Sequence, residues 1–158
     1  MSSESIRAIQ KVFLASPSFA VVGASKDQTK FGTKVLKWYQ ARDLDVKPVH
    51  PVCPLSPPSV GFSFSLQKES ELEGIATVQK ISELSAPDQT SISVITNAKI
   101  TLEILKEAKE LSVPALWLQP GAEDAAVVEY IKENGLADRV IYGGPCILVE
   151  GDGIRSQL

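Results

Sequence analysis

Cysteine and histidine are scarce in this chain of 158 residues, which has two cysteines, Cys53 and Cys146, and one histidine, His50. Their number and separation fit neither a metal-binding cluster nor a redox pair, so both cysteines are expected to be reduced thiols in a reducing compartment. The sequence has no run of about 20 apolar residues that could span a membrane. Its first residues lack the charge and the apolar core of a signal peptide, which favours a cytoplasmic location.

Positive charge is not in excess either, because 16 Lys and Arg stand against 19 Asp and Glu, for a net charge of −3. A nucleic-acid partner would call for a basic patch, and the lysines here are scattered among acids. The last three residues, Ser156-Gln157-Leu158, loosely resemble the peroxisomal Ser-Lys-Leu signal, with Gln157 in place of the basic residue. A peroxisomal location is therefore the alternative, and a plain flexible tail is favoured.

Short apolar strands alternate with amphipathic helices along most of the chain. Strands are predicted over 19–22, 46–49, 76–78, 90–96, 115–118 and 139–142, and helices over 5–14, 32–42, 99–111 and 123–134, with a helical turn over 81–84. This alternation predicts an α/β fold: a Rossmann-like doubly wound parallel sheet with helices on both faces, in a single domain over residues 1–158. Residues 1–17 supply an N-terminal helix, and residues 53–74, rich in proline and serine, form an irregular insertion.

Polar or backbone-rich segments follow four of the predicted strands. In a doubly wound sheet, ligands bind outside the carboxyl ends of the strands, where the strand order reverses. That rule selects Gly23-Ala24-Ser25, His50-Pro51, Thr96-Asn97-Ala98 and Gln119-Pro120-Gly121. Their convergence on one edge of the sheet is the main evidence in the sequence for a binding site.

The segment after the first strand has the composition of a phosphate-binding loop. Gly23 would let the backbone approach a ligand, and the helix that follows offers free amide hydrogens to an anion. Ser25 adds a hydroxyl, Lys26 and Lys30 add positive charge, and Gly32 lets the start of the helix lie close to the sheet. The alternative is a tight turn that binds nothing, and the combination of these residues favours phosphate.

The end of the second strand narrows the choice of nucleotide. A nicotinamide dinucleotide site has a G-x-G-x-x-G turn and an acid about 20 residues later that holds the ribose diol. Here the second strand ends in Val49-His50-Pro51, and Asp43 and Asp45 lie before it, at the wrong end. A missing carboxylate, with Lys47 nearby, favours a phosphorylated ribose, as in coenzyme A (CoA) or NADP.

Three polar residues each keep two interpretations. His50 could hydrogen-bond an adenine or a ribose, or it could cap backbone groups at a strand end. Asn97 could contact a ligand, cap the helix that begins near Lys99, or do both through different atoms. Cys146, after Gly143-Gly144-Pro145, could be a reactive thiol, although a buried structural thiol is favoured. Trp117 is expected in the core.

A catalytic constellation is not evident in the sequence. There is no nucleophile with a partner base and no set of metal ligands. Glu123 and Asp124 open a predicted helix, where acids favour the helix dipole, so we interpret them as capping residues. These observations favour binding over turnover and leave enzymatic activity open.

The pattern resembles the small CoA-binding domain family, often labelled YccU-like and related to the CoA-binding domain of the succinyl-CoA synthetase α subunit. The similarity covers about residues 19–149 and is carried by Val21-Val22-Gly23-Ala24-Ser25, Lys30-Phe31-Gly32, Pro48-Val49-His50-Pro51 and Leu116-Trp117-Leu118-Gln119-Pro120-Gly121. The resemblance implies that Gly23, Ala24 and Ser25 contact the cofactor phosphates and that Lys30 takes the place of a basic residue usual in the family. Cys146 falls near a cysteine common in the family.

Several departures from the family pattern bear on this implication. His50 replaces the asparagine that is usual before the second-strand proline, and Thr96-Asn97-Ala98 replaces a segment that carries an arginine in many relatives. Residues 54–72 look like an insertion, and the phosphohistidine of the synthetase is missing, so ligase activity is not supported. The full set of candidate cofactor-binding residues is Gly23, Ala24, Ser25, Lys26, Lys30, Phe31, Gly32, Pro48, His50, Pro51, Thr96, Asn97, Gln119, Pro120 and Gly121.

Three functions therefore remain in view. The first is a binding or regulatory module for CoA or an acyl-CoA, held through the Gly-Ala-Ser loop. The second is a small NADP-binding protein of the oxidoreductase type. The third is an interaction domain with a vestigial nucleotide pocket, whose protein partner would dock on residues 53–74.

Overall fold

The protein is described by a computed structural model over residues 3–23, 31–49, 71–72, 75–76, 78 and 80–158. The helices are α1 (Ser3–Leu14), α2 (Phe31–Gln40), α4 (Ala98–Glu110), α5 (Ala125–Glu133) and α6 (Ile147–Arg155). The strands are β1 (Ser18–Val22), β2 (Val46–Val49), β3 (Glu71–Leu72), β4 (Ile75–Ala76), β5 (Thr90–Val94), β6 (Leu116–Leu118) and β7 (Val140–Ile141), and short 3₁₀ turns lie at Ile81–Glu83 and Pro87–Gln89.

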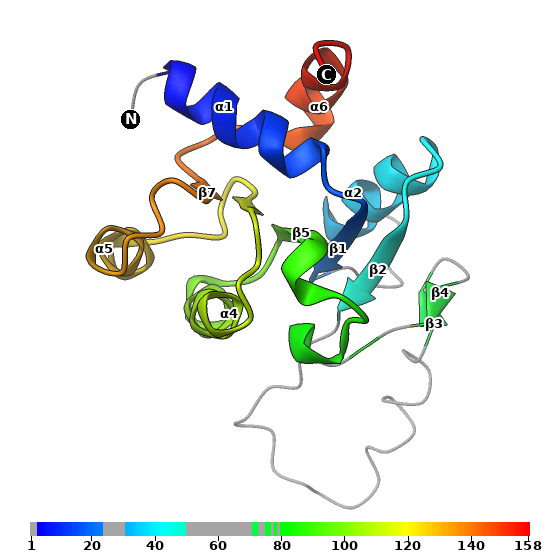
Figure 1. The fold of residues 1–158 in the computed structure, drawn as a ribbon. Helices are drawn as coiled ribbons and strands as arrows, with labels where there is room; N and C mark the ends of the chain where they lie inside the picture. Colours follow the sequence, from blue (N-terminus) through cyan, green and yellow to red (C-terminus); the bar gives the residue numbers. More distant parts are fainter. Residues whose placement is uncertain (1–2, 24–30, 50–70, 73–74, 77, 79) are drawn as a thin grey trace, which may run out of the picture.

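Five strands form a parallel sheet in the order β2-β1-β5-β6-β7 (Figure 1). In the register of β1, Val22 lies opposite Val49 of β2 on one side and Val94 of β5 on the other. The chain leaves β1 for β2 at one edge and then returns to β5 on the other side of β1, so the strand order reverses between β1 and β5. This topology confirms the predicted doubly wound parallel sheet.

Each face of the sheet has its own hydrophobic core. On one face, Ile92 and Val94 of β5 belong to a cluster that includes residues of α4 and α5. On the other face, Phe19 and Val21 of β1 pack in a cluster with residues of α1, α2 and α6, including the buried Trp117. The period of two along β1 therefore sends alternate side chains to opposite helical layers, as the apolar sequence of this strand predicts.

Buried hydroxyl groups join β5 to the second core, the one formed with α1, α2 and α6. Ser93 of β5 lies 2.7 Å from the hydroxyl of Tyr39, and Ser91 donates a hydrogen bond of 2.8 Å to the backbone oxygen of Phe13. These bonds fix α2 and α1 against β5. Burial raises the pKa of Tyr39, although its hydrogen bond with Ser93 acts in the opposite direction, so this hydroxyl stays protonated.

The predicted third strand over 76–78 is only partly correct. Ala76 belongs to β4, which pairs in antiparallel fashion with β3 in a separate two-stranded sheet. Val78 joins the main sheet through an isolated parallel bridge to Val49 and a backbone hydrogen bond of 3.1 Å to Pro48. The end of the predicted irregular segment thus forms a short hairpin, and the main sheet gains one bridge beyond β2.

Helix α6 is absent from the sequence-based prediction. Its two glycines, Gly151 and Gly153, lower helix propensity and hide the pattern. Packing against α2 explains one of them, because a Cβ at Gly151 would lie 2.8 Å from Cη2 of Trp38. Arg42 secures the same contact with two hydrogen bonds of 2.6 Å to the carboxylate of Asp152.

The C-terminal residues continue the last turn of α6. Backbone hydrogen bonds join Ser156 to Asp152 and Leu158 to Arg155, and the side chain of Gln157 accepts a bond of 3.2 Å from Arg7 of α1. The tail is therefore hydrogen-bonded to α6 and to α1 in this structure. In the part of the chain described here, no helix has the length and apolarity needed to cross a bilayer.

Candidate functional site

The carboxyl ends of β1 and β5 meet at Gly23, which has a φ of +106°. The amide of Gly23 donates a 3.3 Å bond to Val49, and the amide of Ile95 donates a 2.8 Å bond to Val22. A Cβ at Gly23 would overlap the carbonyl oxygen of Ile95 and lie 3.3 Å from Cγ2 of Thr96. The two strand ends are thus in direct backbone contact, at the point where the strand order reverses.

The sequence gives one reason for glycine at position 23, the close approach of a ligand to the backbone, and the structure adds another. The missing side chain faces the backbone of β5, so the fold itself requires glycine there. A valine at Gly23 would disturb the contact between β1 and β5 whether or not a ligand binds. Substitution of Gly23 therefore tests the fold and cannot by itself locate the cofactor.

Hydrogen bonds with the first turn of α4 hold the segment after β5 in place. The side-chain oxygen of Asn97 accepts a 3.0 Å bond from the amide of Ile100, which makes Asn97 the N-cap of α4. The hydroxyl of Thr96 lies 2.9 Å from that of Thr101. Of the two interpretations of Asn97, capping is present in the structure. The cap does not use the side-chain nitrogen of Asn97, and the residue is exposed at the surface.

Gln119, directly after β6, is completely buried. Its side-chain oxygen accepts a 3.1 Å hydrogen bond from the amide of Ile147, the first residue of α6. Its side-chain nitrogen is buried and has no hydrogen-bond partner among the described residues. Pro120 and Gly121 follow at the surface, and Gly121 has a φ of +93°. Gln119 therefore joins β6 to α6 through one atom and keeps an unused donor.

Three hydrogen bonds hold the loop between β7 and α6 over the end of β6. The indole nitrogen of Trp117 donates 2.9 Å to the backbone oxygen of Pro145, Gln119 accepts from α6 as described, and Glu123 accepts 2.7 Å from the amide of Gly143. Cys146 occupies the N-cap position of α6 and is partly exposed. The favoured interpretation of Cys146 as a buried thiol is therefore wrong, because this loop leaves it near the surface.

The two acids at the start of α5 have separate roles. Asp124 is the N-cap and accepts a 3.0 Å bond from the amide of Val127, as predicted. Glu123 instead binds the β7–α6 loop, so its predicted capping role is wrong. This contact could not be predicted from local sequence patterns, because its two residues are 20 positions apart.

The remaining candidates divide between described and undescribed residues. Phe31 opens α2 and packs partly buried against the second core, Gly32 is buried beside it, and Pro48 is buried within β2. Ala24, Ser25, Lys26, Lys30, His50 and Pro51 lie outside the described residues. The structure thus brings Gly23, Thr96, Asn97 and Gln119 to the carboxyl edge of the sheet.

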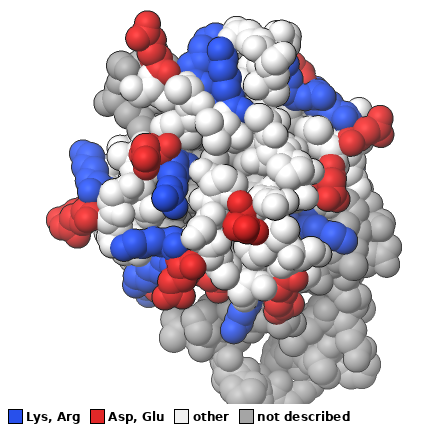
Figure 2. Space-filling view, viewed as in Figure 1, with Lys and Arg blue, Asp and Glu red and all other residues white. Residues whose placement is uncertain are grey.

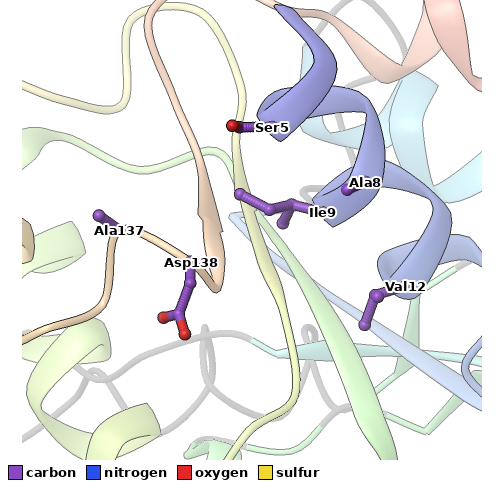
Figure 3. A pocket seen from close by; sticks show the side chains of 6 residues that line it. All are labelled: Ser5, Ala8, Ile9, Val12, Ala137 and Asp138. Carbon is purple, nitrogen blue, oxygen red and sulfur yellow. The ribbon is translucent and has the colours of Figure 1, made fainter. Parts of the chain in front are cut away.

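A groove that sequence reasoning missed lies at the opposite edge. It has a volume of about 490 Å³ between α1 and the α5–β7 loop, and Figure 3 shows the side chains that line it: Ser5, Ala8, Ile9, Val12, Ala137 and Asp138. None of these is a cation, and Asp138 is an anion, so the groove is poorly suited to phosphate. Where the chain is described, no cluster of three potential metal ligands occurs.

The parallel sheet and the reversal of its strand order between β1 and β5 define a Rossmann-type α/β domain. The chain belongs to the CoA binding domain family, whose model matches residues 17–152. This match confirms the resemblance that the sequence carries and supports CoA binding as a general property. No curated protein matches the chain.

Solved structures share this fold over most of their length. A conserved hypothetical protein from Pyrococcus furiosus is 30% identical, with a TM-score of 0.66, over 84% of this chain and 97% of that one. A hypothetical protein from Pyrococcus horikoshii is 19% identical, with a TM-score of 0.72, over 98% and 93%. A protein from Thermus thermophilus is 23% identical, with a TM-score of 0.68, over 98% and 99%. The last two show the fold alone.

Proposed function

We propose that this protein is a binding module for CoA or an acyl-CoA, held at the carboxyl edge of the sheet where the strand order reverses between β1 and β5. The observation that carries the proposal is the reversal of strand order at Gly23 and Thr96 in a chain of the CoA binding domain family. In doubly wound sheets this is where extended nucleotide ligands bind.

The described residues at this edge fit such a ligand. The start of α4 lies beside Thr96, and a helix N-terminus offers amide hydrogens to phosphate oxygens. The buried nitrogen of Gln119 is a hydrogen-bond donor without a partner in the described part of the protein. The arm of CoA carries amide and, when acylated, thioester carbonyls that would accept such a bond.

Further contacts are proposed for residues of the first loop. Ala24 and Ser25 would contact the phosphates, and Lys26 and Lys30 would supply positive charge. On the face seen in Figure 2, lysines and arginines are interspersed with acids rather than gathered by sign. Phosphate binding would therefore depend on local placement of amides and a few lysines rather than on a broad basic surface.

The experiment is thermal denaturation in the presence of CoA, NADP and NAD. A ligand present at about 100 times its dissociation constant stabilises the folded state by about 2.7 kcal/mol, so CoA should raise Tm the most. A larger shift with NADP than with CoA would favour the oxidoreductase-type alternative. No shift with CoA at millimolar concentration would refute the proposal.

A charge-reversal pair locates the binding loop without touching Gly23. Lys30→Glu should weaken CoA binding, because it replaces a phosphate-binding cation with a repelling carboxylate. Lys132→Glu is the matched control, since Lys132 is exposed in the last turn of α5. Equal CoA affinity in the two variants would remove Lys30 from the site.

A further inference from the structure

Helices α1 and α6 lie side by side in the layer that covers one face of the sheet, away from α4 and α5 (Figure 1). Among the described residues, the large hydrophobic side chains that are exposed are Val12 of α1, Val149 of α6 and Leu158 just after α6, at 55%, 80% and 60%. Single exposed apolar residues are common on protein surfaces. Here they all belong to one pair of neighbouring helices, and such a concentration is typical of an interaction surface.

Gly153 is an exposed glycine on the same side of α6 as Val149. The two residues are four positions apart, so they lie one above the other on the helix. A Cβ at Gly151 would collide with Trp38, whereas no atom lies within 4 Å of a Cβ at Gly153. Glycine weakens a helix interior, so the described part of the fold gains nothing from it at position 153. Glycine is favoured where another backbone comes close, and here that neighbour must come from outside the described residues.

Short and apolar side chains also cover the outer side of α1. Ala8 and Val12 are both exposed and lie one turn apart, next to the groove between α1 and the α5–β7 loop. Short side chains allow a second helix to pack closely. We use the name α1–α6 face for the surface made by Ala8, Val12, Val149 and Gly153.

The charges of the two helices are complementary. Helix α1 carries one acid and two bases, and α6 carries two acids and one base, which gives net charges of +1 and −1. The bases of α1 are Arg7 and Lys11, and the acids of α6 are Glu150 and Asp152. Asp152 also binds Arg42 of its own chain, but 59% of its side chain stays exposed. In a two-fold symmetric pair with α1 of each chain against α6 of the other, a basic helix therefore meets an acidic one twice.

We propose that the α1–α6 face binds a second copy of this chain, in a two-fold symmetric dimer in which α1 of each copy packs on α6 of the other. Val12 and Val149 are removed from water at this interface, and Gly153 lets the facing helix approach α6 closely. The inference does not depend on the proposed function, because no ligand takes part in the contact.

The size of the α1–α6 face predicts a weak dimer. The two helices have 12 and 9 residues, so they are about 18 and 14 Å long. Two helices of this length offer less than the roughly 800 Å² per partner that a stable complex buries. We therefore expect reversible association with a dissociation constant in the micromolar range.

The test is sedimentation velocity of the ligand-free chain at about 5 to 500 µM, a range that covers weak association. The sedimentation coefficient should rise with concentration from that of a monomer to that of a dimer. Val12→Asp and, separately, Val149→Asp should each raise the dissociation constant at least about tenfold, because a charge is then buried in an apolar contact. The matched control is Ala126→Asp, which changes an exposed residue of α5 on the opposite face of the sheet and should associate as the native chain does.

The variant Gly153→Ala should change stability and association in opposite directions. Its methyl group has open space in the single chain, so Tm should rise. The same methyl group would stand between α6 and the facing helix, so the dissociation constant should rise about tenfold. An unchanged dissociation constant would remove Gly153 from the interface.

Cross-linking of a mixture of isotope-labelled and unlabelled chains locates the contact. A zero-length reagent that joins amines to carboxylates should link Lys11 of one chain to Glu150 or Asp152 of another. Three results would overturn the proposal: a chain that stays monomeric up to about 500 µM, a dimer that Val12→Asp and Val149→Asp leave unchanged, or links between chains that avoid both helices. The shift of Tm by CoA is measured separately, so each of these results would leave the proposed function standing.

Discussion

Replacing Gly23 with alanine adds one methyl group at the contact between β1 and β5. The residue has a φ of +106°, which side chains rarely adopt, and the new Cβ would overlap the carbonyl oxygen of Ile95. It would also lie 2.8 Å from the carbonyl carbon of Ile95, which belongs to the backbone and cannot rotate away. Either β1 moves from β5, or the turn after β1 changes its path.

The expected loss of stability has two parts. A non-glycine residue held at such a φ costs about 1–3 kcal/mol. Forcing extra volume into a close-packed contact costs about 1–3 kcal/mol more. Gly23→Ala should therefore lower the free energy of unfolding by about 2–6 kcal/mol, a large part of the 5–15 kcal/mol usual for a domain.

The variant Gly121→Ala separates the cost of the positive φ from the cost of the overlap with β5. Gly121 has a φ of +93°, and no atom lies within 4 Å of the position that its Cβ would take. This variant should lose only the backbone part, about 1–3 kcal/mol. Urea denaturation followed by the fluorescence of the buried Trp38 and Trp117 measures both variants. Equal losses for Gly23→Ala and Gly121→Ala would refute the argument that the strand contact excludes a side chain.

Three further predictions concern the helices. Gly151→Ala should lower Tm because its Cβ would overlap the indole of α2, whereas Gly153→Ala has open space and should raise stability by about 0.5–1 kcal/mol. Asp124→Ala should cost about 1 kcal/mol in urea denaturation, since it removes the cap of α5; an unchanged midpoint would contradict this. The hydrogen bond from Arg42 lowers the pKa of Asp152, so Asp152→Asn should lose stability at neutral pH and match the native chain once the pH falls below that lowered value.

The parallel sheet with helices on both faces could be predicted from the sequence because it follows from local patterns. Phe19 to Val22 is apolar at every position, which fits only a strand covered on both faces. Helix α6 could not be predicted in this way. Its glycine at 151 is favourable only because Trp38 packs there, and that contact joins residues more than 100 positions apart.

The edge of the sheet that carries the candidate site could be predicted from the sequence. The contacts that the side chains make at this edge could not. The parallel topology alone places Gly23, Thr96 and Gln119 at the carboxyl ends of neighbouring strands. What each side chain does there depends on long-range partners: Ile95 for Gly23, and Ile147 for Gln119. The sequence therefore pointed to Gly23 as a residue of this edge, but it did not indicate that the backbone of β5 excludes a side chain there. It also favoured a buried position for Cys146, which is partly exposed.

Gln119 shows how the same residue can serve the fold and a ligand. A side-chain amide kept only for stability would be expected to pair both its oxygen and its nitrogen, because a buried unpaired donor costs about 1–3 kcal/mol. Here the oxygen fixes the start of α6, while no described residue accepts from the nitrogen. A ligand that supplies the acceptor would recover that cost on binding, and this is the part that we propose for Gln119 at the carboxyl edge of the sheet.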